Sequence, residues 1–234
     1  MVIKIVKNSF FYEIIDNEKT LLTLSQSIAG YNLGDLAAHT GLNLPRDLKS
    51  NKGWIGNLIE KCLGANAKSK PQPDFLKLGV ELKTIPVNSH GRPLQATFIC
   101  SVSLSLKKNI GITWKISNVR YKLSRILWVP IEGEKTIPLA LRRVGTPFLW
   151  SPSDYEENTI RCDWEELIEL VICGEIENVS TRNGEILQIC PTATRDNKFH
   201  EIIGKNRQPI RIRPLGFYLR KNFTALILAR QFLL

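Results

Sequence analysis

The sequence lacks any apolar run that approaches the ~20 residues of a membrane-spanning helix. The first fifteen residues are interrupted by Lys4, Lys7, Asn8 and Glu13, which is not the pattern of a signal peptide. Both absences argue against a membrane protein or a secreted one. We therefore expect a cytoplasmic protein with no membrane partner.

Histidine and cysteine are scarce and scattered. The three histidines stand far apart, and none of the five cysteines belongs to a C-x-x-C pair or lies near a histidine at metal-ligand spacing. No serine or cysteine stands in a recognisable nucleophile motif. These absences argue against a zinc site, a histidine-centred mechanism and nucleophilic catalysis by serine or cysteine, and we expect the cysteines to be reduced.

Positive charge, in contrast, is abundant. The 32 Lys and Arg against 22 Asp and Glu give a net charge of +10. Residues 154–177 hold nine acids and one base, a balance of −8, so the rest of the chain carries +18. Nine bases follow from Arg195 onward, interleaved with aromatic residues. This composition favours a polyanionic partner, with nucleic acid first, although a solvated basic surface is the alternative.

The hydrophobic pattern predicts one α/β domain, or two lobes, of mixed sheet flanked by helices. Helical spacing covers 21–40 with a break at 30–34, then 53–63, 119–125 and 223–232. Strand-like spacing covers 75–86, 96–106, 126–131 and 185–189. In the acidic segment, Trp164, Leu167, Ile168 and Val171 predict a helix with Asp163 near its start and Gly174 at its end. We expect this helix to face away from DNA or toward a basic partner.

The stretch from Pro73 to Lys83 carries the candidate chemistry. If 80–85 is a strand, Glu81 and Lys83 share one face while Leu82 points into the core. A turn at 77–79 would bring Asp74 back beside Glu81. Two converging carboxylates, with a backbone carbonyl such as that of Leu82, form the oxygen-rich site that Mg²⁺ prefers, and Mn²⁺ is a possible substitute. This arrangement suits metal-assisted phosphodiester hydrolysis, in which Lys83 orients water and neutralises charge.

The Glu-x-Lys motif alone is weak evidence for a catalytic site, because it is expected about once by chance in a chain of this length. An exposed strand with a surface Glu and Lys is the alternative interpretation. The preceding Asp74, the apolar neighbours and the basic charge favour the catalytic one. Glu60 lies in the middle of a predicted helix, where a glutamate is usually just solvated.

Many ordered segments resemble the MutH mismatch-repair endonucleases, a family with the PD-(D/E)xK restriction-endonuclease-like fold. They are Gly53-Trp54-Ile55-Gly56 with Glu60, Leu63-Gly64-Ala65, Ser69-Lys70-Pro71, Asp74-Phe75, 78–87, Gly91-Arg92-Pro93-Leu94, Arg142-Arg143-Val144-Gly145, Leu149-Trp150-Ser151-Pro152, Asp163-Trp164-Glu165-Glu166-Leu167, Gly216-Phe217-Tyr218-Leu219 and Lys221-Asn222-Phe223-Thr224. The resemblance covers nearly the whole chain except residues 1–20. We therefore expect an N-terminal extension at 1–20 and a two-lobed endonuclease domain at 21–234.

The resemblance implies a DNA cleft between the lobes and a catalytic set of Asp74, Glu81 and Lys83, with Glu60 as a supporting acid. It also implies nicking of the unmethylated strand at hemimethylated GATC and activation by the MutL ATPase. We expect the protein to act as a monomer in a bacterial cytoplasm, at the nucleoid. The residues expected to contact DNA are Lys52, Lys122, Pro191, Tyr218 and Lys221. Surface roles for the lysines, and a core or stacking role for Tyr218, remain open.

One residue departs from the family pattern. The position before Pro191 is usually basic in the family and is Cys190 here. A thiol cannot make the bidentate contact to guanine that arginine makes, so we expect relaxed site stringency or methylation sensing. A restriction enzyme of the same fold that cuts both strands, or a DNA-binding protein without catalysis, are the competing functions. The second would predict a substitution at Asp74, Glu81 or Lys83, and all three are present.

Overall fold

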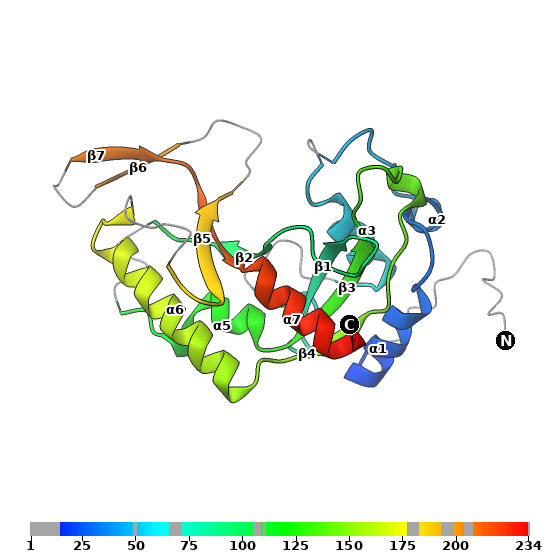
Figure 1. Ribbon diagram of the computed structural model, residues 1–234, viewed down its shortest axis with the longest axis horizontal. Helices are drawn as coiled ribbons and strands as arrows, with labels where there is room; N and C mark the ends of the chain where they lie inside the picture. The colour runs from blue at the N-terminus through cyan, green and yellow to red at the C-terminus, as the bar shows by residue number, and fades with distance from the viewer. Residues whose placement is uncertain are drawn as a thin grey trace.

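The computed structural model describes residues 15–48, 51–65, 72–104, 109, 111–176, 183–192, 199–203 and 208–233. Helices and strands alternate along these parts of the chain, and Figure 1 shows an elongated molecule with α1–α3 at one end and α6 with β5–β7 at the other. Among the described residues, no helix is both long and apolar enough to cross a bilayer.

A three-stranded mixed sheet lies at the centre. It consists of β1 (Glu81–Val87), β3 (Ile126–Glu132) and β4 (Phe148–Trp150) in the order β1-β3-β4. The first pair is parallel and the second antiparallel. Strand β3 is the middle strand and is buried along almost its whole length, whereas β1 lies at the sheet edge.

Helices cover both faces of this sheet, and each face contributes to a separate hydrophobic core. One core joins Leu82, Leu127 and Val129 to the N-terminal helices α1 (Glu18–Ser27), α2 (Leu33–Thr40) and α3 (Trp54–Cys62). The other joins Ile85 and Trp128, on the opposite face, to the rest of the chain. The expected α/β fold with a helix-flanked mixed sheet is confirmed.

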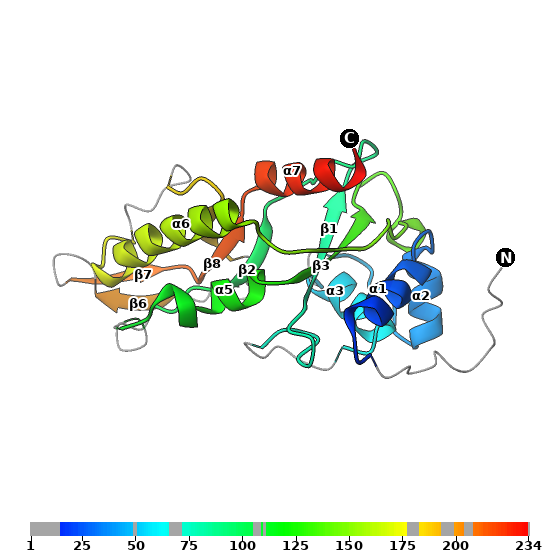
Figure 2. The same ribbon diagram turned by 90° about the horizontal axis from the view of Figure 1, so that it is seen from below.

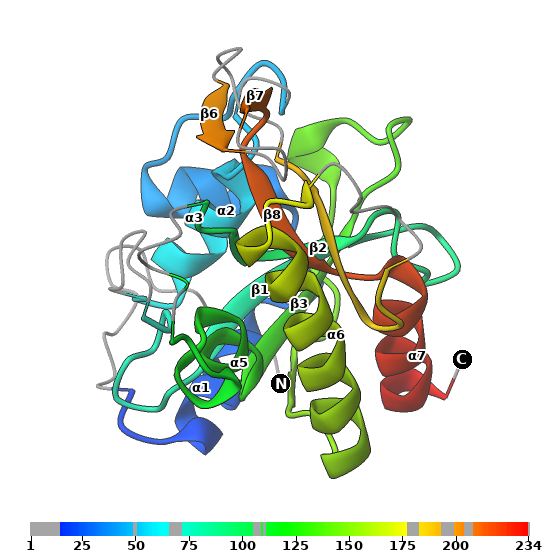
Figure 3. The same cartoon turned by 90° about the vertical axis from the view of Figure 1, so that its left-hand side faces the viewer.

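The second core is built from a second sheet and three helices. Strands β2 (Thr97–Ser101), β8 (Leu215–Leu219) and β5 (Leu187–Pro191) form an antiparallel sheet in the order β2-β8-β5. The helices α5 (Asn118–Leu123), α6 (Asp154–Ile172) and α7 (Lys221–Phe232) pack against it. Figures 2 and 3 show α6 and α7 side by side on one side of this sheet and α5 nearer the central strands.

The remaining elements are short. A hairpin of β6 (His200–Ile203) and β7 (Pro209–Ile212) projects at one end, and single 3-10 turns occur at η1 (Trp114–Ile116) and η2 (Leu139–Leu141). Strands β4 and β6–β8 were not predicted from the sequence. Three of them have only three or four residues, so their hydrophobic period is too brief to recognise, and β8 has Gly216 inside its five residues.

Several predicted boundaries shift. The strand expected at 75–86 begins only at Glu81, because 75–79 forms a turn closed by a bridge between Phe75 and Val80. The strand expected at 96–106 spans 97–101, and residues 105 and 106 lie outside the described part. The strand expected at 185–189 spans 187–191, and the helix expected at 119–125 spans 118–123. The break near Gly30 and the end of α3 at Gly64 are confirmed.

The prediction that Asp163 lies near a helix start is wrong. Helix α6 begins nine residues earlier, at Asp154, where Ser153 and Glu156 form a reciprocal capping box. Asp163 lies inside the helix and is almost fully buried. Its carboxylate accepts hydrogen bonds from the backbone N–H groups of Glu185, Ile186 and Leu187 at 2.7–2.8 Å. An aspartate that resembles a helix cap in sequence therefore holds a distant segment instead.

Candidate active site

Glu81 lies at the start of β1, and its side chain is only 2% exposed. Its Oε1 atom accepts from Nζ of Lys83 at 2.6 Å and from Nζ of Lys122 at 2.8 Å. Lys83 comes from the same face of the same strand, as the alternation of side chains predicted, whereas Lys122 comes from α5. A carboxylate is rarely buried without partners, and here two ammonium groups compensate its charge.

The second oxygen of Glu81 is different. Glu81 Oε2 is buried and has no hydrogen-bond partner. A buried carboxylate oxygen without a partner carries a desolvation cost that a cation would remove. Both lysines bind Oε1, so Oε2 remains the free ligand position of this group.

The turn before β1 places Asp74 beside that strand. Backbone bonds between Phe75 and Val80 close the turn, and Gly79 adopts a left-handed conformation with φ of +66°. Asp74 Oδ2 then accepts from the N–H of Leu82 at 2.8 Å. The N–H groups of a strand point alternately to its two sides. The Glu81 N–H points toward β3 and donates to the Arg125 carbonyl, so the Leu82 N–H points to the open edge of the sheet, where Asp74 can accept from it. The predicted return of Asp74 to β1 is confirmed.

Glu60 lies on α3 and shares the electrostatic environment of this group. Burial raises the pKa of Glu60, and the nearby charge of Asp74 raises it further, while Lys83 and Lys122 lower it. Burial also raises the pKa of Asp74, followed by the charge of Glu81. The structure therefore brings three carboxyl groups and two lysines into one electrostatic group, although among these five described residues no hydrogen bond joins Glu60 to the other four.

The donor chemistry suits a hard cation. Among the described residues, no three or more His, Cys, Asp or Glu side chains converge as a ready-made metal cage. The fit therefore depends on Asp74, the free Oε2 of Glu81 and oxygen donors from backbone or water, which is the kind of partial set that Mg²⁺ uses. Cys100 lies near this group, and burial raises its pKa to about 11, so its thiol stays protonated and is a poor ligand.

The residues expected to contact DNA fall on several elements. Tyr218 on β8 and Gln188 on β5 are register partners and so share one face of the second sheet, away from the buried Ile189 and Phe217. Phe98 on β2 packs edge-on against Tyr218 at 5.3 Å. Cys190 lies on the same face, because it pairs with Gly216 two residues along.

The other expected contacts are less uniform. Pro191, at the end of β5, and Lys221, at the start of α7, are exposed, as is Lys52 before α3. Lys122, in contrast, is only 12% exposed and binds Glu81. Its position beside the Glu81 carboxylate was not predicted, since 41 residues separate the two in sequence and nothing local connects them.

The buried Asp163 and the half-buried Arg220, which the sequence did not connect with the site, hold the start of β5. Asp163 accepts the three N–H groups of 185–187, and the Arg220 guanidinium donates to the carbonyls of Asn183 and Gly184 at 2.6 and 3.0 Å. A Cβ at Gly184 would lie 2.1 Å from the carbonyl oxygen of Leu187. The strand that carries Cys190 and Pro191 is thus fixed at its beginning.

Comparison with known proteins identifies the family of this chain. Residues 63–163 match the family described as "DNA mismatch repair enzyme MutH". The chain is 54% identical over 218 residues to the DNA mismatch repair protein MutH of Klebsiella pneumoniae strain 342, covering 93% of this chain and 94% of that protein. It is 53% identical over the same length to the DNA mismatch repair protein MutH of Salmonella paratyphi C. With near-complete coverage at this identity, the chain belongs to the MutH family of DNA mismatch repair enzymes.

Proposed function

We propose that this protein is a Mg²⁺-dependent endonuclease of mismatch repair that nicks the unmethylated strand of hemimethylated GATC. The observation that carries the proposal is the Glu81 carboxylate, with two lysines on one oxygen and no partner on the other. Family membership supports a role on DNA. The catalytic set predicted from the sequence, Asp74, Glu81 and Lys83, is intact.

In this proposal Asp74 and Glu81 hold the metal ion, aided by the backbone carbonyl of Leu82. Bound Mg²⁺, or Mn²⁺ in its place, would supply an activated water and neutralise charge at phosphorus. Lys83 orients that water and stabilises the developing negative charge, because its ammonium already lies 2.6 Å from the metal-binding carboxylate. Lys122 adds a second positive charge at the same carboxylate. Glu60, on α3, adds a third acid to the same electrostatic group.

In this proposal, the second sheet recognises the DNA sequence. Tyr218, held by Phe98, is the rigid aromatic group that disfavours an added methyl on adenine in the major groove. Lys52, Pro191 and Lys221 contact the duplex on either side. We further infer that the protein acts as a monomer in the bacterial cytoplasm, at the nucleoid, and that MutL activates it.

The test is nicking of a hemimethylated GATC duplex with Mg²⁺ and MutL. We expect the wild-type protein to nick only the unmethylated strand and Lys83→Ala to lose activity by about 100-fold or more, as is typical when a charge-stabilising group is removed. Lys135→Ala removes an exposed lysine from a turn and serves as the matched control. Cleavage of both strands would favour a restriction enzyme instead, and DNA binding without cleavage would favour a binding protein.

A further inference from the structure

Helix α5 is too short to hold its own position. It has six residues, whereas isolated helices shorter than about 12 residues are marginal in water. Two apolar side chains, Val119 and Leu123, anchor it in the core, and Ser117 caps it by accepting the Arg120 N–H at 3.1 Å. The orientation of its polar side chains therefore depends on contacts from other elements.

Two polar residues of α5 point in opposite directions. Arg120 and Lys122 are two positions apart, or about 200° around a helix. Arg120 Nε donates to Glu157 Oε1 on α6 at 2.9 Å, and Lys122 Nζ donates to Glu81 Oε1 on β1 at 2.8 Å. The short helix is thus a bridge from α6 to the catalytic carboxylate.

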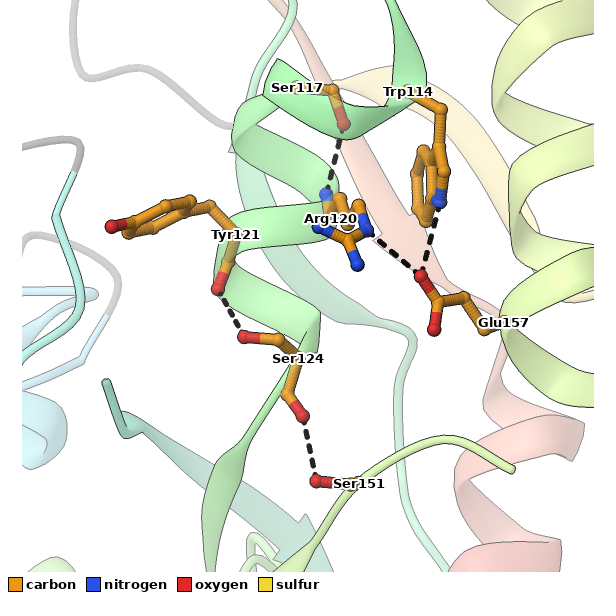
Figure 4. A network of polar contacts seen from close by, with 7 residues as sticks. All are labelled: Trp114, Ser117, Arg120, Tyr121, Ser124, Ser151 and Glu157. Carbon is orange, nitrogen blue, oxygen red and sulfur yellow. Dashed lines mark hydrogen bonds and ion pairs between the residues drawn. The ribbon is translucent and has the colours of Figure 1, made fainter. Parts of the chain in front are cut away.

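Glu157 is itself fixed. The indole N–H of Trp114 donates to the same Oε1 atom at 3.4 Å, and Figure 4 shows Arg120 and Trp114 meeting at this oxygen. At the other end of α5, the hydroxyl of Ser151 donates to the carbonyl of Ser124 at 2.7 Å. Neighbouring elements therefore hold α5 at both ends.

We propose that Glu157 is a positioning residue, which acts through Arg120 to set where the Lys122 ammonium lies against Glu81. Lys83 needs no such support, because it lies two residues from Glu81 on the same strand. Lys122 needs this support, because it reaches Glu81 only through the position of α5. The consequence for cleavage rests on the proposed function, whereas the placement of Lys122 does not.

The ion pair is suited to a test that leaves the fold intact. The side chains of Arg120 and Glu157 are 42% and 39% exposed, and ion pairs with this exposure contribute little to stability. Glu157→Ala removes the contact. Glu165→Ala is the matched control, because Glu165 is an exposed glutamate of the same helix.

The first measurement follows acetylation of individual lysines by an amine-reactive reagent, read by mass spectrometry, without metal or DNA. We expect Lys122 in Glu157→Ala to react several-fold faster than in the wild-type protein, while Lys83 keeps its wild-type rate as internal reference. The control should match wild type at both lysines. An unchanged Lys122 rate, or equal acceleration of both lysines, would overturn the proposal.

The second measurement uses single-turnover nicking and a charge swap. We expect Glu157→Ala to nick about tenfold more slowly, since a 1 Å displacement of a catalytic group can cost about 100-fold. Arg120→Glu combined with Glu157→Arg should restore both the nicking rate and the protection of Lys122. If Lys122 in Glu157→Ala reacts faster while the variant nicks at the wild-type rate, the proposed effect on cleavage is wrong. If the wild-type protein does not nick, the proposed function fails while the acetylation result still decides the placement.

Discussion

At the scale of single residues, Glu60 is held at a cost to stability. Burial and the nearby Asp74 raise its pKa, so the folded protein disfavours the charged form. The penalty is fully present above the folded pKa and disappears as pH falls below the unfolded value. Catalytic groups commonly carry such a cost.

We therefore expect Glu60→Gln to raise the melting temperature at pH 8 while lowering nicking activity. The gain in melting temperature should shrink as pH falls toward the ordinary range of glutamate. Thermal unfolding at several pH values checks this, with Glu165→Gln as the exposed control. A variant that melts lower than wild type at pH 8 would contradict the electrostatic reasoning.

Cys190 is a second residue with a specific consequence. It lies on the same sheet face as Tyr218, and burial raises the pKa of its thiol, so it stays neutral. We expect Cys190→Arg to sharpen discrimination between GATC and sites with one altered base pair by about 1–3 kcal/mol, or roughly 5- to 150-fold. Competitive nicking of the two duplexes measures this. Cys162→Arg, on the exposed face of α6, adds the same charge elsewhere and should change neither rate selectively.

At the scale of elements, β5 depends on a carboxylate from α6. The Asp163 carboxylate accepts hydrogen bonds from the backbone N–H groups of Glu185, Ile186 and Leu187. We expect Asp163→Ala to destabilise the protein by about 3 kcal/mol or more, because buried donors are left without partners. Urea unfolding measures the change. Glu165→Ala should stay within about 0.5 kcal/mol of wild type, and a similarly small effect for Asp163→Ala would contradict this role.

The elements also show what local pattern can and cannot predict. The amphipathic run that became α3 and the turn that returns Asp74 to β1 were predictable, because the signals lie within a dozen residues. The misplaced start of α6 and the role of Lys122 were not. Both depend on partners far along the chain: Asp163 binds residues 185–187, and Lys122 binds Glu81. The candidate triplet of Asp74, Glu81 and Lys83 stood out only because the apolar setting and the family resemblance supplemented a weak motif.

At the scale of the whole molecule, charge is distributed unevenly. Most of the acids of residues 154–177 lie on α6, and the rest of the chain carries a large positive excess. We expect DNA affinity to fall as salt rises, with a slope near −0.9 per neutralised phosphate and a loss of about 10³-fold between 50 and 200 mM for six contacts. Fluorescence anisotropy with a GATC duplex measures the slope. Affinity insensitive to salt would contradict a phosphate-binding surface.

The turn that carries Asp74 has a consequence for how copies of this protein meet. Strand β1 is an open sheet edge, the kind of surface that invites pairing with a strand from another chain. Part of this edge is occupied: Asp74 accepts the Leu82 N–H, Pro86 has no N–H, and the Pro86 carbonyl accepts from Leu94. Asp74, which we propose holds the metal ion, thus also covers one donor of this open edge, so that a substitution there would expose a strand to pairing with another chain as well as remove a carboxylate.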